Sequence, residues 1–156
     1  MIEKVGDVLA RVRTAGRSAL LEHEVYEVLA AAGFDVPRFA FWAGEPTGAV
    51  PDEVASLLQK APGEVVLKIV SPEILHKSDV GGVTVAAAEP ATVGIAARRV
   101  WDEVGRRMPD AARSGVLIVE KVKARSGSPA VETLLSLKQD PAFGPVLVLG
   151  LGGVLT

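Results

Sequence analysis

Apolar and polar positions repeat with the period of a helix in the N-terminal part of the chain. Residues 2–14 place apolar side chains on one face, and Gly16 ends this pattern. A second amphipathic segment covers residues 18–32, with Ser18 as a suitable N-cap and Gly33 as a C-terminal stop. The pattern therefore predicts two consecutive helices.

Shorter apolar runs, bounded by glycine, proline and polar residues, predict strands farther along the chain. Two more amphipathic helices are expected, one beginning at Pro51 and one from Ala91 to about Met108. Helices and strands do not alternate regularly, and the spacing after Gly115 is that of antiparallel hairpins, so we expect an α+β fold. The predicted strands are residues 36–42, 65–70, 83–88, 116–119, 131–137 and 146–149, with residues 123–129 as a hairpin loop before the returning strand 131–137 and residues 139–145 as a later loop.

Three larger side chains within these segments require separate interpretation. Trp101 falls on the apolar stripe of the last helix and is expected in the core. His23 lies between two glutamates, and we expect it on the surface. Lys68 stands inside the apolar strand 65–70, where its burial is costly unless an anion pairs with it. Two interpretations of Lys68 remain open: an edge lysine that reaches water, or a cation directed at phosphate oxygens.

The residues after this strand favour the phosphate interpretation of Lys68. Ser71 and the following proline end the strand, and a polar loop leads to Gly81 and Gly82. A glycine pair permits close approach of the backbone, and free N–H groups there can hold phosphate. His76, in the middle of the loop, could act as a base, a metal ligand or a phosphate carrier.

Composition limits the classes of function. The chain has 156 residues, is 49% hydrophobic and has a mean hydropathy of +0.32, so it can bury a core. A net charge of −2 gives no support to electrostatic nucleic-acid binding, and no apolar run is long enough for a membrane span. The lack of cysteine excludes disulfides, thiolate catalysis and cysteine-based zinc sites, and fits a cytoplasmic location.

Four stretches together resemble a known family. They read ALLEHEVYEVLAAAGFDVP, LKIVSPEILHKSDVGG, LIVEKV and QDPAFGPVLVLGLGG, and the similarity covers about residues 19–156. They resemble the ATP-grasp subunit of the ADP-forming acyl-CoA synthetases, which are relatives of succinyl-CoA synthetase. The resemblance implies an ATP-grasp fold in which nucleotide lies between two α+β subdomains. With the boundary expected near Pro109, the parts are an N-terminal helical extension (1–18), a first subdomain (19–108) and an incomplete second subdomain (109–156).

The resemblance also implies roles for particular residues. Lys68 matches the strand lysine that contacts nucleotide phosphates, and His76 matches a histidine that relays phosphate between a partner's phosphohistidine and the nucleotide. Both are candidate catalytic residues. Glu120 begins the segment that matches the hinge for the adenine edge. The implied nucleotide-binding set is Lys68, Ser71, Gly81, Gly82, Glu120, Lys121, Val122 and Glu132.

The implied reaction converts acyl-CoA, ADP and phosphate into carboxylate, CoA and ATP. It needs a CoA-binding alpha subunit or domain as partner, and Mg²⁺ whose ligands in the family would lie beyond Thr156, so we expect no metal ligands in this chain. Two alternatives remain open: a non-catalytic module that senses nucleotide or docks a partner, and the same domain attached to another activity such as control of protein acylation.

The end of the chain gives a further expectation. Residues 146–149 are wholly apolar and suggest an inner strand, which needs a neighbour on each side. Few residues follow it, so we expect the uncovered sheet edge to be covered by self-association or by another chain. We also expect the isolated chain to make no ATP.

Overall fold

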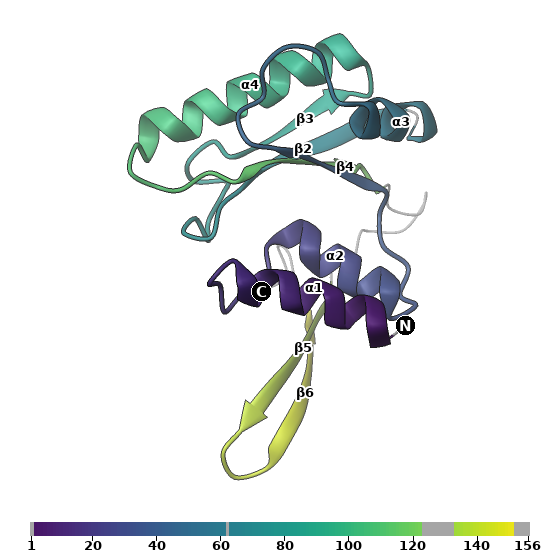
Figure 1. Ribbon diagram of the computed structural model, residues 1–156, viewed down its shortest axis with the longest axis vertical. Coiled ribbons are helices and arrows are strands. Elements are labelled where there is room, and N and C mark those ends of the chain that lie inside the picture. The colour runs from purple at the N-terminus through teal and green to yellow at the C-terminus, as the bar shows by residue number, and fades with distance from the viewer. Residues whose placement is uncertain (1, 62, 123–132, 152–156) are drawn as a thin grey trace. The chain divides into compact units, whose positions relative to one another are not determined.

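The computed structural model describes residues 2–61, 63–122 and 133–151 (Figure 1). They fall into two compact units, and the division between the units lies between Lys121 and Val122.

The first unit contains one antiparallel sheet and four helices. The strand order in the sheet is β1-β4-β2-β3, and every neighbouring pair is antiparallel. This confirms the α+β class. The elements, in chain order, are α1 (Ile2–Thr14), α2 (Glu22–Ala31), β1 (Phe39–Ala43), α3 (Asp52–Lys60), β2 (Glu64–Val70), β3 (Val83–Ala87), α4 (Pro90–Arg107) and β4 (Gly115–Glu120).

One face of the sheet forms the main core with α3 and α4 (Figure 1). Alternate residues of β2 point to this face and are fully buried, because successive side chains of a strand point to opposite sides. Trp101 lies in this core, as its place on the apolar stripe of α4 predicted. The buried side chains of this core that come from the two central strands are Val65, Leu67, Ile69, Val116 and Ile118.

The opposite face of the sheet packs against α2. Leu21, just before α2, and Tyr26 within it contact a smaller cluster built on Val70, Leu117 and Val119. α1 adjoins α2, and an ion pair between Arg11 and Glu27 links the two helices.

His23 is buried, which contradicts the surface position expected from the sequence. It is 8% exposed, and its ring stacks on Phe41 with centroids 3.9 Å apart. The flanking glutamates suggested an exposed position, but α2 turns His23 toward β1. In a helix the neighbours of a residue in sequence point in different directions and do not report its own burial.

The start of α2 also differs from the prediction. The helix begins at Glu22, and Leu21 takes the N-cap position in place of Ser18. The carboxylate of Glu24 accepts a hydrogen bond from the N–H of Leu21 at 2.7 Å, so a side chain inside the first turn caps the helix. Arg17 pairs with the same carboxylate and fixes the approach of the preceding chain.

The expected subdomain boundary near Pro109 differs from the division in the structure. β4 lies between β1 and β2, so the first unit continues to Lys121 and includes α1 as well. The expected hairpin between residues 116–119 and 131–137 is wrong, because β4 pairs with β1 and β2. Side chains on both faces of β4 are buried, which suits a central strand better than one arm of a hairpin.

The described strands of the second unit form a hairpin of β5 (Thr133–Asp140) and β6 (Gly144–Leu151). Its turn is shorter than the loop expected at residues 139–145. The carboxylate of Asp140 accepts hydrogen bonds from the N–H groups of Ala142 and Phe143, and Gly144 supplies the positive φ (74°) that the turn requires. The expected inner strand 146–149 is part of β6, whose described partner is β5.

Candidate functional site

Lys68 lies on the face of the sheet that packs against α2. Its neighbours in β2 alternate, with Leu67 and Ile69 directed into the main core and Lys68 directed away from it. Its Nζ donates a hydrogen bond to Oε1 of Glu22, the first residue of α2, at 2.6 Å. Lys68 is therefore a half-buried, ion-paired lysine, and neither of the two simple interpretations from the sequence included this partner.

The carboxylate of Glu22 also binds a second lysine, Lys77. Nζ of Lys77 donates to Oε2 of Glu22, so each carboxylate oxygen holds one ammonium group. The side chains of Lys68, Glu22 and Lys77 are 27%, 22% and 20% exposed, which places all three between the core and solvent. Three separate segments, namely β2, α2 and the loop after β2, thus meet in one charged cluster.

Interactions within this cluster keep both Lys68 and Glu22 in their charged forms. Burial would lower the pKa of Lys68, but the hydrogen bond and charge of Glu22 outweigh burial and hold that pKa above its ordinary value. Burial would likewise raise the pKa of Glu22, but hydrogen bonds from the two lysines hold it below its ordinary value. Lys68 is thus a cation and Glu22 an anion at neutral pH.

His76 lies beside this cluster, in the loop between β2 and β3. It is exposed, and together with the charged cluster it lines an open pocket of about 520 Å³. The structure therefore brings together Lys68 and His76, the two residues that the sequence suggested for catalysis. The lining residues are Glu22, Lys68, Leu75, His76, Lys77, Ser78, Asp79 and Val83.

Ser71 and the two glycines close the loop that carries His76. The hydroxyl of Ser71 accepts hydrogen bonds from the N–H groups of Glu73 and Ile74 and so caps the turn after β2. Gly81 donates to the carbonyl of Ser78, and Gly82 donates to the carbonyl of Lys77 at 2.7 Å. The expectation of free glycine N–H groups for phosphate is therefore wrong, because both are used inside the loop.

Steric demands explain the glycine pair. Gly81 has a φ of +70°, which side-chain-bearing residues rarely adopt. At Gly82, a Cβ atom would lie 2.6 Å from the Cγ2 of Ile69 and 2.9 Å from the carbonyl oxygen of Lys77. These glycines shape the loop, and the cations of the site come from lysine side chains.

The suggested hinge residues lie at the far end of β4. Lys68 pairs with Leu117 in the sheet, and Glu120 comes three residues later, or about 10 Å farther along the strand. The N–H groups of Glu120 and Lys121 already donate to the carbonyls of Arg38 and Glu64. Val122 is 68% exposed. The last residue of the suggested nucleotide-binding set, Glu132, lies outside the described residues.

Glu22 is the member of this charged cluster that the sequence did not reveal. A signal existed, because a lysine inside an apolar strand requires an anion nearby. Many glutamates could satisfy that requirement, and only the docking of α2 on the sheet selects Glu22.

The chemistry of the cluster fits the phosphates of a nucleotide better than it fits a metal. Two ammonium groups beside an exposed imidazole can bind phosphate oxygens. Within residues 2–61, 63–122 and 133–151, no group of three or more histidine or acidic side chains could hold a metal ion.

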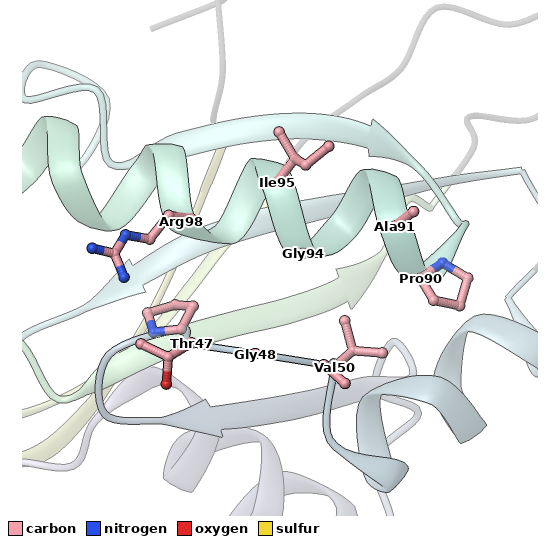
Figure 2. A pocket seen from close by; sticks show the side chains of 10 residues that line it. Thr47, Gly48, Val50, Pro90, Ala91, Gly94, Ile95 and Arg98 are labelled. Carbon is pink, nitrogen blue, oxygen red and sulfur yellow. The ribbon is translucent and has the colours of Figure 1, made fainter.

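A larger pocket of about 700 Å³ lies elsewhere in the first unit, between residues 46–50 and the N-terminal half of α4 (Figure 2). Its lining is mostly apolar, with Arg98 at one side. Arg98 pairs with Glu45 and Asp102, so its charge is already neutralised. None of the described residues suggested for nucleotide binding, from Lys68 to Val122, lines this pocket.

Comparison with known proteins decides the family. The sequence model of the ATP-grasp domain family matches residues 11–156. The chain belongs to the ATP-grasp family. The ATP-grasp assignment agrees with the resemblance found in the sequence, and the sheet and helices of the first unit are the part of that fold described above.

Several ATP-grasp relatives are ADP-forming ligases. The 4-hydroxybutyrate–CoA ligase [ADP-forming] of Nitrosopumilus maritimus is 36% identical over 151 residues, which is 97% of this chain and 20% of that protein. The beta subunit of acetate–CoA ligase [ADP-forming] II of Pyrococcus furiosus is 31% identical over 151 residues, which is 94% of this chain and 58% of that subunit.

A solved structure shows the same fold. One chain of the dinucleotide forming acetyl-coenzyme A synthetase 1 of Ca. Korarchaeum cryptofilum, in complex with coenzyme A, Ca-AMPCP and HgCl+, superposes with a TM-score of 0.76 at 36% identity. The match covers 95% of this chain and 60% of that chain. This ATP-grasp chain therefore spans less than two thirds of the length of each of these three relatives.

None of the helices in the described part of the ATP-grasp chain has the length and hydropathy that a membrane-spanning segment requires.

Proposed function

We propose that this chain is the nucleotide-binding part of an ADP-forming acyl-CoA synthetase. In that role it passes a phosphoryl group between a CoA-binding partner and ADP, so that acyl-CoA, ADP and phosphate become carboxylate, CoA and ATP. The observation that carries this proposal is the shared pocket of Lys68 and His76. The names of the relatives support the reaction class.

His76 is the proposed carrier of the phosphoryl group. Neutral imidazole is a good nucleophile, and phosphoimidazole is a reactive donor. In the transfer to ADP, the P–N bond to His76 breaks as a terminal phosphate oxygen of ADP forms the new P–O bond. The exposure of His76 on a loop supports this role, because the ring must reach a partner on one side and the nucleotide on the other.

Lys68 is the proposed cation for the transferring phosphate. Charge on the phosphate oxygens is the main electrostatic demand of this chemistry, and a fixed ammonium group in a partly dry pocket meets it. Glu120, Lys121, Val122 and Glu132 are proposed for the adenosine end, and a magnesium ion for the phosphates. Ser71, Gly81 and Gly82 are proposed to shape the loop at the nucleotide, since the N–H groups of the two glycines already donate inside the loop.

The test is acid-labile phosphate incorporation in the full protein assembled with its CoA-binding partner. We expect His76→Ala to abolish labelling of this chain, so that only the partner's phosphohistidine is labelled, and Lys68→Ala to keep labelling of this chain but slow discharge to ADP, by about 10²-fold or more. The control is Phe34→Ala, which changes an exposed apolar side chain outside this pocket and should behave as the wild type. Normal labelling and normal turnover in His76→Ala would overturn the carrier role.

A further inference from the structure

Glu22 occupies a position that an anionic ligand would need. Its two carboxylate oxygens each accept a hydrogen bond from a different ammonium group, that of Lys68 in β2 and that of Lys77 in the loop after β2. A phosphate group offers the same arrangement, since two of its oxygens can accept from two cations at once. Glu22 thus has the chemistry of a phosphate stand-in supplied by the chain itself.

The net charge of the pocket depends on where the carboxylate of Glu22 lies. Its lining carries Lys68 and Lys77 against Glu22 and Asp79, so the four formal charges cancel. A ligand phosphate that approaches this pocket meets no excess of positive charge while Glu22 stays on the lysines. If the carboxylate of Glu22 turns away, the described lining has one excess positive charge, and the two ammonium groups lose the carboxylate that they share.

Glu22 is well placed to turn away. It is the first residue of α2 and its side chain is 22% exposed, so a change of side-chain rotamer brings the carboxylate into water without moving the helix. The cap of α2 comes from Glu24, so the helix start does not depend on Glu22. The backbones of the two lysines, by contrast, are held by β2 and by the hydrogen bonds that close the loop.

We propose that Glu22 is an internal counter-anion that a phosphate-bearing ligand displaces from Lys68 and Lys77. The displacement makes Lys77 a second phosphate-binding cation beside His76, and it keeps the pocket electrically neutral until the ligand arrives. This inference rests on the proposed function, because it takes the ligand to be the nucleotide that Lys68 contacts.

The test is calorimetric binding of ADP to the full chain and its variants. Glu22→Gln removes the competing charge, and we expect ADP to bind roughly tenfold more tightly, since two partly exposed ion pairs no longer oppose it. Glu27→Gln is the matched control, because Glu27 lies on the same helix and pairs with Arg11 outside this pocket. It should leave ADP affinity unchanged. If Glu22→Gln does not fold, Glu22→Asp replaces it, since the shorter side chain cannot hold both lysines and should give a smaller gain in affinity.

A second readout separates displacement from a static structural role. The carboxyl ¹³C resonance of Glu22, identified by its loss in Glu22→Gln, should titrate at a higher pH with ADP bound than without it, because the two lysines no longer stabilise its charge. An unchanged titration midpoint, or ADP affinity that is equal or weaker in folded Glu22→Gln, would overturn the inference.

Lys68→Ala distinguishes this failure from that of the proposed function: weaker ADP binding in Lys68→Ala together with no gain in Glu22→Gln rejects the counter-anion alone. Unchanged binding in Lys68→Ala rejects both.

Discussion

The imidazole of His23 is buried against Phe41, and its Nδ1 finds no hydrogen-bond partner among the described residues. Burial lowers the pKa of His23, and this effect exceeds the opposing attraction of Glu24 and Glu27. The folded protein therefore holds His23 neutral at pH values at which an exposed histidine would take up a proton.

We predict that His23 makes the protein less stable as the pH falls below about 6.5, the ordinary pKa of histidine. In that range the unfolded chain binds a proton at His23 that the folded chain excludes, so protonation favours unfolding. His23→Phe preserves the stacked ring, and its free energy of unfolding should change less than that of the wild type between pH 7 and 5.5. Chemical denaturation at several pH values measures this.

A buried ring without an ionisable group provides the control. Trp42→Phe should keep the pH dependence of the wild type, because it changes packing and removes no titratable group. Parallel stability curves for His23→Phe and the wild type would contradict the prediction. Glu22 and Glu24 have lowered pKa values and add their own loss of stability in more acidic solution, which is why the comparison stops at pH 5.5.

Individual side chains were predictable from the sequence where their chemistry alone decides the outcome. Trp101 lies on an apolar stripe, and the structure places it in the core. The cost of burying Lys68 correctly indicated that an anion would pair with it. The partner of Lys68 was not predictable, because Glu22 is 46 residues away and meets it only through tertiary packing. The burial of His23 escaped prediction for the same reason.

At the scale of elements, the loop between β2 and β3 depends on close packing at Gly82. Its N–H donates to the carbonyl of Lys77, and its carbonyl accepts from the N–H of Ile69 at 2.7 Å, so it ties the loop to the strand. A side chain at this position would meet Ile69 and the loop backbone at once.

We predict that Gly82→Ala lowers the free energy of unfolding by about 1–3 kcal/mol, the usual cost of overpacking a tight site. It should also weaken ADP binding, because the displaced loop carries Lys77 and His76. Thermal and chemical denaturation measure the first effect, and calorimetry measures the second. Gly6→Ala is the control: Gly6 lies inside α1 with open space around it, so alanine should stabilise by about 0.5–1 kcal/mol. Equal stability of Gly82→Ala and the wild type would contradict the packing argument.

Element positions followed from the sequence more closely than element partners did. Hydrophobic periodicity located α4 and the strands β2, β3 and β4 to within a few residues, because burial of one face imposes that period. Pairing was harder, and residues 116–119 were assigned to a hairpin with the next strand. Periodicity reports how many faces of a strand are buried, and it does not report which strands lie beside it.

At the scale of the whole molecule, the hairpin of β5 and β6 exposes many apolar side chains. Leu135 pairs with Leu149 and Leu137 pairs with Leu147, so these four leucines share one face of the hairpin. Each is at least 59% exposed. A two-stranded hairpin is only marginally stable in water, and an apolar face of this kind favours association.

We predict that the 156-residue chain, purified by itself, self-associates through this leucine face. Its sedimentation at increasing concentration should show dimers or larger species. Leu137→Lys with Leu149→Lys should shift it toward monomer, because burying either ammonium group against another leucine face is costly. Lysines at Val85 and Ile95, which are exposed in the first unit, provide the control and should leave association unchanged. A strictly monomeric wild-type chain would contradict this prediction.

The central place of β4 has a consequence for how the first unit is made. Of the four strands of the sheet, β4 is the last to leave the ribosome, yet β1 and β2 contact each other only through it. The β2–β3 hairpin can close early, whereas β1 must wait for a partner far downstream in the chain. Pairings of such long sequence separation form slowly. Until Glu120 has been synthesised, β1 and β2 therefore each have one edge that lacks its partner strand, β4. During that interval the growing polypeptide is most exposed to misfolding and to capture by chaperones.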